Sequence, residues 1–369
     1  MSRYTFSIAQ PNDDAQLRAR MAADWIDGTV ALSLRREPSY FAASRLQGAM
    51  RTIVCREAAT GDIVATLGRS VATVFLHGKP CRAALVSDVR VAQTHRGRGL
   101  VPRLFSELQA LHEADPMPCY ALIYDDNDRA LRSLAGGRPG MPRWRPFSRL
   151  TTHALHLGAS RREAAPPRVE LRRARAADLP DIMRFLGARY KTCSWAPVLE
   201  IDDFLPGGRC DTLRADDFFV AIREGRICAT IAAWDQAPLR QAHVERYAGP
   251  IAYARPLYNV LAALRGRPPL PAPGARLPYV YLAFIAAQHD DASLCGALLR
   301  HVCNALGGRR WLHAVAALDQ ADPLSRAFGG YRAIRSTVSC YEIEFDAGRG
   351  QISTAAAGAA RPRVEFALT

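Results

Sequence analysis

The second half of this chain repeats the pattern that opens the first half. Residues 3–13 alternate apolar and polar side chains, as a strand does, and end in acidic residues that can cap a helix. Residues 168–178 follow the same pattern at an offset of 165 residues. An apolar helical stripe and a predicted hairpin come after each copy. An internal repeat of this kind predicts two tandem domains of one architecture.

Shifts in composition mark the borders of these domains. We place the first domain at residues 1–157, a linker containing two prolines at 158–167 and the second domain at 168–347. Residues 348–369 are rich in Ala and Gly, and we expect them to form a mobile tail.

Bulk composition restricts the class of protein. The 369 residues are 49% hydrophobic and 23% charged, as in a soluble globular protein. No apolar run approaches the roughly 20 residues that span a bilayer, and the first residues lack a secretory segment. We therefore expect a cytoplasmic protein with no membrane partner. Nine scattered cysteines predict free thiols, and no Cys/His cluster has zinc-ligand spacing, so no metal is predicted.

The net charge of +14 is almost entirely arginine, with lysine only at positions 79 and 191. A charge of this size could indicate a nucleic-acid partner. However, such a skew toward arginine often reflects the base composition of the coding sequence. It is also explained in part by attraction of a small anionic ligand. We therefore do not expect nucleic acid as a partner.

A basic loop with two glycines forms the most informative motif. Residues 83–91 are an apolar run that predicts a buried strand, and Arg96-Gly97-Arg98-Gly99 follows. Leucines spaced by four at 100, 104 and 108 then predict a helix. A strand, a glycine loop and a helix start direct backbone N–H groups and the positive helix end to one point, which suits a diphosphate. The alternative is an ordinary turn with solvated arginines.

Arg96-x-x-Gly99 after Asp-Val-Arg-Val resembles the pyrophosphate-binding signature of the GNAT superfamily of acyl-CoA-dependent N-acetyltransferases. The departure is Val101 at the last signature position, followed by Pro102, which has no N–H. With the repeat, the resemblance implies an α/β (α+β) protein of two tandem GNAT-like domains. Each would be a mixed central sheet flanked by helices.

The resemblance also implies where CoA is held. The expected contacts are the end of the strand, the loop, the first helical turn and one residue after the next strand: Val89, Arg90, Val91, Arg96, Gly97, Arg98, Gly99, Leu100, Val101 and Asn127. The second domain lacks this loop, and Asp290 and Asp291 would repel a diphosphate there. We therefore expect a degenerate second domain and one CoA per chain.

In this family an amine attacks the acyl thioester directly, so a base and an acid are needed. Asp88 is the best-placed carboxylate to take the proton of the amine. Tyr124 can protonate the departing thiolate, because Leu134 stands where the family has tyrosine. The structural alternatives are an ion pair of Asp88 with an arginine and packing of Tyr124 in the core.

The implied protein is an N-acetyltransferase with acetyl-CoA as co-substrate and a small-molecule or peptide amine as acceptor. The alternative is a non-catalytic acyl-CoA-binding or scaffold protein, which Leu134 and the degenerate second domain favour. Either class leaves an oligomer open.

Overall fold

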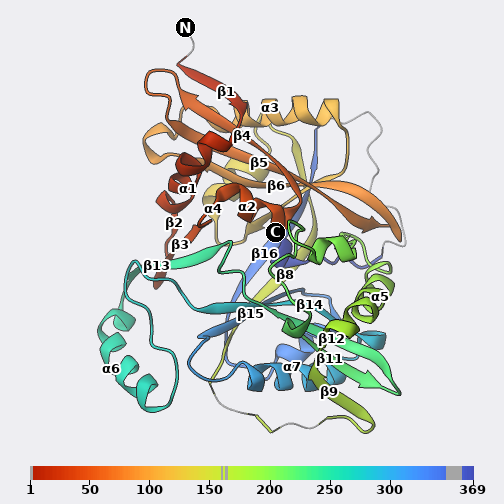
Figure 1. The fold of residues 1–369 in the computed structure, drawn as a ribbon. Coiled ribbons are helices and arrows are strands. Elements are labelled where there is room, and N and C mark those ends of the chain that lie inside the picture. The colour runs from red at the N-terminus through yellow and green to blue at the C-terminus, as the bar shows by residue number, and fades with distance from the viewer. Residues whose placement is uncertain (1–2, 159–160, 163–164, 346–359) are drawn as a thin grey trace.

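The computed structural model describes residues 3–158, 161–162, 165–345 and 360–369. One 13-stranded sheet runs through the molecule (Figure 1). In spatial order its strands are β1 (Tyr4–Ile8), β4 (Ala49–Glu57), β5 (Ile63–Leu76), β6 (Lys79–Val91), β7 (Cys119–Tyr124), β16 (Ala333–Glu344), β8 (Arg143–His156), β15 (His313–Asp319), β14 (Tyr279–Ala287), β12 (Arg226–Trp234), β11 (Phe218–Arg223) and β9 (Val169–Arg173). The thirteenth strand, β10 (Ala196–Pro197), pairs with β5. A second sheet joins β13 (Gln241–Tyr247), β3 (Val30–Arg35) and β2 (Trp25–Ile26).

The two halves exchange their closing strands. β16, from the second half, lies between β7 and β8 of the first half, and β8 pairs with β15 of the second half. β8 and β16 are antiparallel neighbours, from Leu155 opposite Ala333 to Arg143 opposite Glu344. Each half therefore completes its sheet with a strand of the other. The sequence boundary at residue 157 divides the chain but not the sheet.

Helices flank this sheet: α1 (Asp14–Ala23), α2 (Tyr40–Ser44), α3 (Leu100–Ala114), α4 (Asp128–Ala130), α5 (Leu179–Tyr190) and α7 (Ala292–Ala305). A further helix, α6 (Pro250–Leu264), does not flank it (Figure 1). α3 and α7 follow the corresponding strands β6 and β14 of the two halves. α3 buries the predicted leucines at 100, 104 and 108, and α7 buries a similar stripe. Burying one leucine contributes about 2 kcal/mol, so these stripes hold each helix to its half of the core.

The expectation of a mobile tail is wrong for residues 360–369. Val364, Ala367 and Leu368 are buried, and the last residues form a short 3-10 turn at Phe366–Leu368. The physical reason is that these apolar side chains complete the core between β14 and β15. Residues 346–359, the rest of the expected tail, lie outside the described residues, as do 159–160 and 163–164 of the expected linker.

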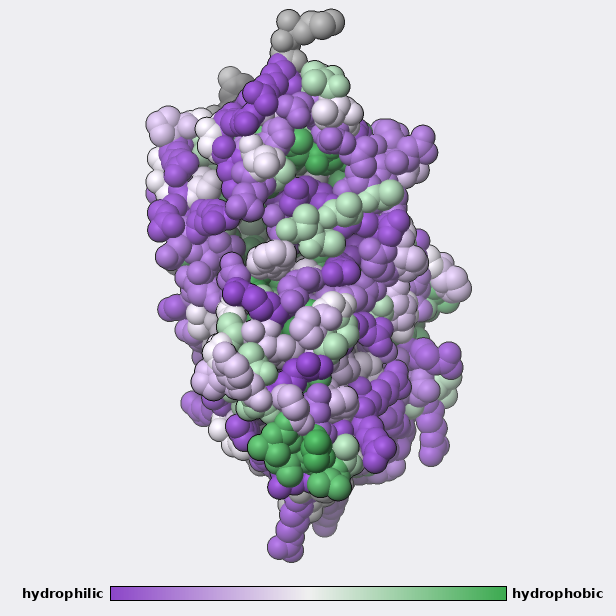
Figure 2. Space-filling model, turned by 90° about the vertical axis from the view of Figure 1, so that its left-hand side faces the viewer, coloured by the Kyte–Doolittle hydropathy of each residue, from purple (hydrophilic) through white to green (hydrophobic). Residues whose placement is uncertain are grey.

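α6 stands apart from the layers of the sheet (Figure 1). The largest hydrophobic patch in the view of Figure 2 lies over this part of the molecule. No helix among the described residues is long and apolar enough to cross a membrane. Within the same residues, no group of three or more His, Cys, Asp or Glu side chains is arranged to hold a metal ion.

Candidate active site

The first half of the sheet opens between β6 and β7. These parallel strands pair only at Ala84 with Cys119 and at Leu85 with Tyr120. Beyond this point β6 bulges, with a φ of 53° at Asp88 and a shift in its register with β5. The ladder therefore leaves backbone groups of residues 86–91 on the β7 side without a partner strand. An extended, amide-bearing ligand can bind to such groups.

The loop after β6 leads into the open N-terminus of α3. Gly97 and Gly99 have φ of 75° and 68°, a region that L side chains rarely adopt. A Cβ on either glycine would meet nothing within 4 Å, so open space lies beside the loop. Gly99 is the N-cap residue, and no side chain of the described residues caps the first turn. Free N–H groups and the helix dipole therefore face this space, which suits an anion.

Neighbouring side chains hold the loop in place. Arg98 donates to the hydroxyl of Tyr4 at 3.2 Å, and the same hydroxyl lies 3.0 Å from Nδ1 of His95. Arg96 donates to the carbonyl of Val91 at 3.3 Å and contacts Asp24 at 3.4 Å. The two predicted phosphate arginines thus lie at the loop, tied to β1 and to the end of α1.

The structure corrects the role of Asp88. Its carboxylate lies 2.8 Å from the guanidinium of Arg36 and accepts a hydrogen bond from Tyr40 at 3.0 Å. Both members of the ion pair are buried, with side-chain exposures of 8% and 9%. Burial lowers the pKa of nearby Arg90, and the charges of Asp88 and Asp24 oppose that shift. Asp88 is therefore the counter-ion of buried arginines, and its carboxylate is not free to act as a base.

Tyr124 lies at the end of β7 and faces the second half. Burial raises the pKa of its phenol, nearby Tyr281 raises it further, and Arg240 opposes the shift. The phenol is protonated at neutral pH, as an ordinary phenol also is, and 37% of the residue is accessible. A protonated phenol at the edge of the β6–β7 opening can donate a proton there.

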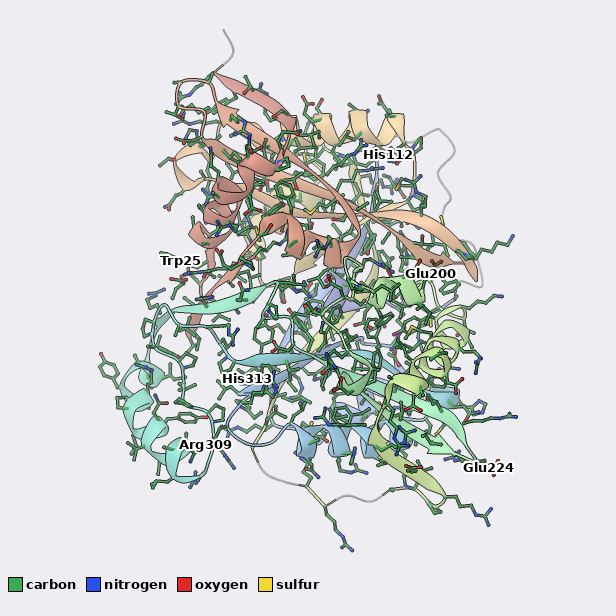
Figure 3. The ribbon with its side chains drawn as sticks, viewed as in Figure 1. Trp25, His112, Glu200, Glu224, Arg309 and His313 are labelled. Carbon is green, nitrogen blue, oxygen red and sulfur yellow. The ribbon has the colours of Figure 1, made fainter. Side chains whose placement is uncertain are left out.

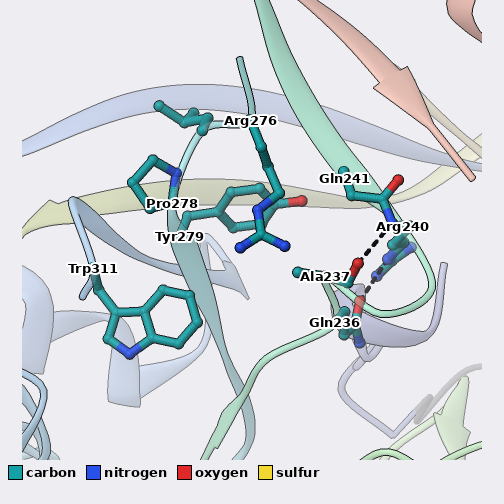
Figure 4. A pocket seen from close by; sticks show the side chains of 9 residues that line it. Gln236, Ala237, Arg240, Gln241, Arg276, Pro278, Tyr279 and Trp311 are labelled. Atoms are coloured by element: carbon teal, nitrogen blue, oxygen red, sulfur yellow. Dashed lines mark hydrogen bonds between the residues drawn. The ribbon is translucent and has the colours of Figure 1, made fainter. Parts of the chain in front are cut away.

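Arg240 organises the surroundings of Tyr124. Its guanidinium lies 4.9 Å from the ring centre of Tyr281 and donates to the carbonyls of Ala367, at 2.6 Å, and Thr369. It also donates to Gln236 at 2.5 Å, beside a small cavity lined in part by Arg276 and Trp311 (Figure 4). The sequence analysis did not identify Arg240 or Tyr281, because only the fold brings them to Tyr124.

The two residues after β7 that the family comparison singled out have local roles. The side-chain oxygen of Asn127 accepts from the backbone N–H of Ala130 at 3.1 Å and caps α4. Leu134 is buried in the core of the first half. A contact of Asn127 with CoA remains a prediction.

In the second half, β14 and β15 separate as β6 and β7 do in the first half, but another segment of the chain fills the gap between them. β14 bulges at Phe284, with a φ of 52°, and pairs with β15 only from Tyr279 to Tyr281. In the first half, Thr66 Oγ1 donates to the carbonyl of Asp88 at 2.8 Å; in the second, Thr230 Oγ1 donates to that of Phe284 at 2.9 Å.

The segment that fills the second opening comes from the end of the described chain. The Glu365 carboxylate accepts from the backbone N–H of Phe284 at 2.9 Å. Arg363 donates to the carbonyl of Ile285 and, at 3.0 Å, to Asp322. The side chains of Glu365 and Arg363 therefore bind the backbone N–H and carbonyl groups that the bulge exposes.

The N-terminus of α7 is closed as well. The Asp291 carboxylate accepts from the N–H groups of Ser293 and Leu294, at 2.9 and 3.0 Å. Asp290 pairs with Arg189 at 2.5 Å and with Arg361 at 3.2 Å. Carboxylates of the chain thus occupy the place that a diphosphate would need, as a degenerate second domain requires.

The fold therefore consists of two bulged and splayed half-sheets that are joined through exchanged closing strands. Residues 29–123 match the family described as acetyltransferase (GNAT) domain. N-myristoyltransferase of Saccharomyces cerevisiae with bound myristoyl-CoA is 10% identical with a TM-score of 0.59, over 95% of this chain and 84% of that one. The GCN5-related N-acetyltransferase of Sphaerobacter thermophilus is 12% identical with a TM-score of 0.55, over 100% and 99% of the two chains. A search of curated proteins finds no match.

The match identifies a GNAT domain in the first half of this chain, and the likeness to the solved structures extends to the fold of both halves. At these identities the solved structures share its fold, while the family match lies on the half that carries the open loop.

Proposed function

We propose that this protein is an acyl-CoA-dependent N-acyltransferase that transfers an acetyl group from acetyl-CoA to an amine. One observation supports this most directly: the first turn of α3 has no side-chain cap and follows Gly99, whereas Asp291 caps α7. The diphosphate of CoA would bind at α3, with Arg96 and Arg98 beside it. Its pantetheine would follow the backbone of Val89, Arg90 and Val91.

The acceptor would enter where the two halves meet at Tyr124. Its amine nitrogen attacks the acyl carbon, and the carbon–sulfur bond breaks. The phenol of Tyr124 gives its proton to the departing thiolate, and the resulting phenolate regains a proton that the nitrogen releases. Tyr124 is suited to the acid role by its position, because its phenol carries a proton and lies at the end of β7 where the two halves meet.

The test measures CoA binding and turnover separately. Acetyl-CoA and longer acyl-CoA thioesters are offered with small amines, peptide N termini and lysine, and free CoA and product mass are followed. Tyr124→Phe should lower turnover about 100-fold while the Kd for CoA changes less than twofold. CoA binding without turnover on every amine would replace this proposal with a non-catalytic acyl-CoA-binding protein. Unchanged turnover in Tyr124→Phe would assign the acid elsewhere.

A further inference from the structure

Helix α6 presents its apolar face to solvent. Tyr253, Leu257, Val260, Leu261 and Leu264 follow the spacing of one helical face. Their exposures are 88, 65, 60, 40 and 79%. These side chains belong to the part of the molecule over which the large hydrophobic patch of Figure 2 lies.

The polar side of α6 faces the protein. Asn259 accepts from the backbone N–H of Leu270 at 2.8 Å and donates to its carbonyl at 3.2 Å. Arg255 donates to the same carbonyl at 3.3 Å. A helix on the surface of a globular protein normally turns its apolar stripe inward. The reversed orientation of α6 therefore leaves a continuous apolar face for something outside the chain.

The segment that carries this face is basic, and one of its arginines, Arg246, pairs with Asp27. Residues 246–287 contain arginines at positions 246, 255, 265, 267 and 276, and no Asp, Glu or Lys. Arg265 and Arg276 are exposed, and the whole chain carries a net charge of +14. A partner that matches this surface is apolar inside and anionic at its boundary.

We propose that α6 binds the surface of an anionic lipid bilayer, with its leucines among the acyl chains and its arginines at the headgroups. Aliphatic residues flanked by tyrosine and arginine have this preference. The protrusion of α6 from the body lets it reach a flat surface (Figure 1). A second copy seated face to face on α6 fits less well, because each copy would bring the same arginines and no acid from this segment.

Binding of α6 to a bilayer would make a membrane surface a partner of this protein, and it does not depend on acyl transfer. The sequence led us to expect no membrane partner because no segment is long enough to span a bilayer. A helix that lies in the interface needs no such length.

The test is flotation with phosphatidylcholine vesicles, with and without phosphatidylglycerol. The protein should float with the anionic vesicles, stay unbound with the neutral ones and be released by high salt. Leu257→Glu combined with Leu264→Glu should lower the partition coefficient at least about tenfold, since each leucine loses its burial. Both sites are exposed and glutamate is a good helix former, so the fold should remain intact.

Leu205→Glu is the matched control. Leu205 is 50% exposed, and nearby Glu200 lies on the opposite side from α6 in Figure 3. This variant should float like the wild type. Absence of binding to anionic vesicles, or equal binding to neutral ones, would overturn the proposal. So would light scattering that shows an oligomer which the α6 variant dissociates while vesicle binding stays unchanged.

Discussion

Helices α3 and α7 begin at corresponding places in the two halves, yet their first turns differ. α3 begins after Gly99, with open space beside the loop and no side-chain cap. α7 begins after Asp291, whose carboxylate accepts from two N–H groups of the first turn. In the second half, a carboxylate of the chain accepts hydrogen bonds from the backbone N–H groups of the first helical turn. In the first half, the corresponding N–H groups are open to an external anion. One fold can therefore hold an anion site or close it through the residue at the helix start.

The two bulges show a second difference on the same backbone. In the first half the bulge residue is Asp88, within a buried cluster with Arg36 and Arg90. In the second half it is Phe284, which stacks with Phe218 and Trp234 at ring distances of 5.9 and 6.0 Å. The threonine that donates to the bulge carbonyl is present in both halves. Backbone geometry is thus shared, while one half buries charge and the other buries aromatic surface.

The largest effect should come from breaking the charged bulge. Asp88→Asn leaves the buried guanidinium of Arg36 without its counter-ion, and we expect a loss of about 3 kcal/mol in the free energy of unfolding. Urea denaturation measures it. Asp27→Asn, in the exposed ion pair with Arg246, should stay within the error of the measurement. A fully stable Asp88→Asn with strongly reduced turnover would instead restore Asp88 as the catalytic base.

The next effect tests the open helix start. Gly99→Val places a side chain where an anion would approach and strains a φ of 68°, so CoA affinity should fall about 100-fold, which is about 2.7 kcal/mol. Calorimetry measures the Kd. Gly225→Val, at a φ of 73° with equally open space in the second half, reproduces the strain and should leave the Kd unchanged. Equal losses in the two variants would mean that the effect comes from the fold.

The seam between the halves should respond to acid. Figure 3 shows His313 on β15, and His153 lies on the neighbouring strand β8. Burial lowers the pKa of both to about 4, with the charge of Arg335 adding to the shift of His153 and that of His156 to the shift of His313. The folded state favours neutral rings, so this stability is full above pH 6.5 and is lost as the pH falls toward 4.

We expect each of the two histidines to account for about 2 kcal/mol of the free energy of unfolding between pH 7.5 and 5, measured by urea denaturation. His153→Phe should reduce the loss, because the ring nitrogens of His153 have no hydrogen-bond partner in the part of the chain that the structure describes. Phe328→Leu removes the ring stacked on His153 at 5.1 Å but keeps the imidazole, so the pH dependence should persist. A wild-type stability that is flat over this range would contradict the burial argument.

Local patterns predicted much of the first half but not how the halves join. The strand at 83–91 and the leucine stripe from Leu100 are confirmed in β6 and α3. The exchange of β8 and β16 has no local signature, because a closing strand has the same alternation whichever neighbour it pairs with. The pairing of β13, at residues 241–247, with the distant β3 has no local signature either.

Two features of the candidate site needed the folded structure. The ion pair of Asp88 with Arg36 joins residues that are 52 positions apart in the sequence. The closing of the second half depends on Glu365, which reaches β14 across 81 positions. Residue spacing in the sequence carries no information on such contacts, whereas glycines in a strand–loop–helix pattern do predict the open site.

The smallest effect is expected from removing the cap of α7. This change distinguishes between the helix cap and the segment at the β14 bulge as the reason why the second half does not bind CoA. Asp291→Ala removes the cap of α7 and should cost about 1 kcal/mol of stability. It should not create a second CoA site, because residues 361–368 still occupy the β14 bulge through Glu365 and Arg363. Titration with CoA should therefore still give about one equivalent per chain, because of the two corresponding helices α3 and α7 only α3 would offer an open bulge and an open first turn. Ser39→Ala, which removes the cap of α2, provides the matched control for a lost cap. A second equivalent in Asp291→Ala alone would mean that the helix cap, rather than the inserted segment, keeps CoA out of the second half.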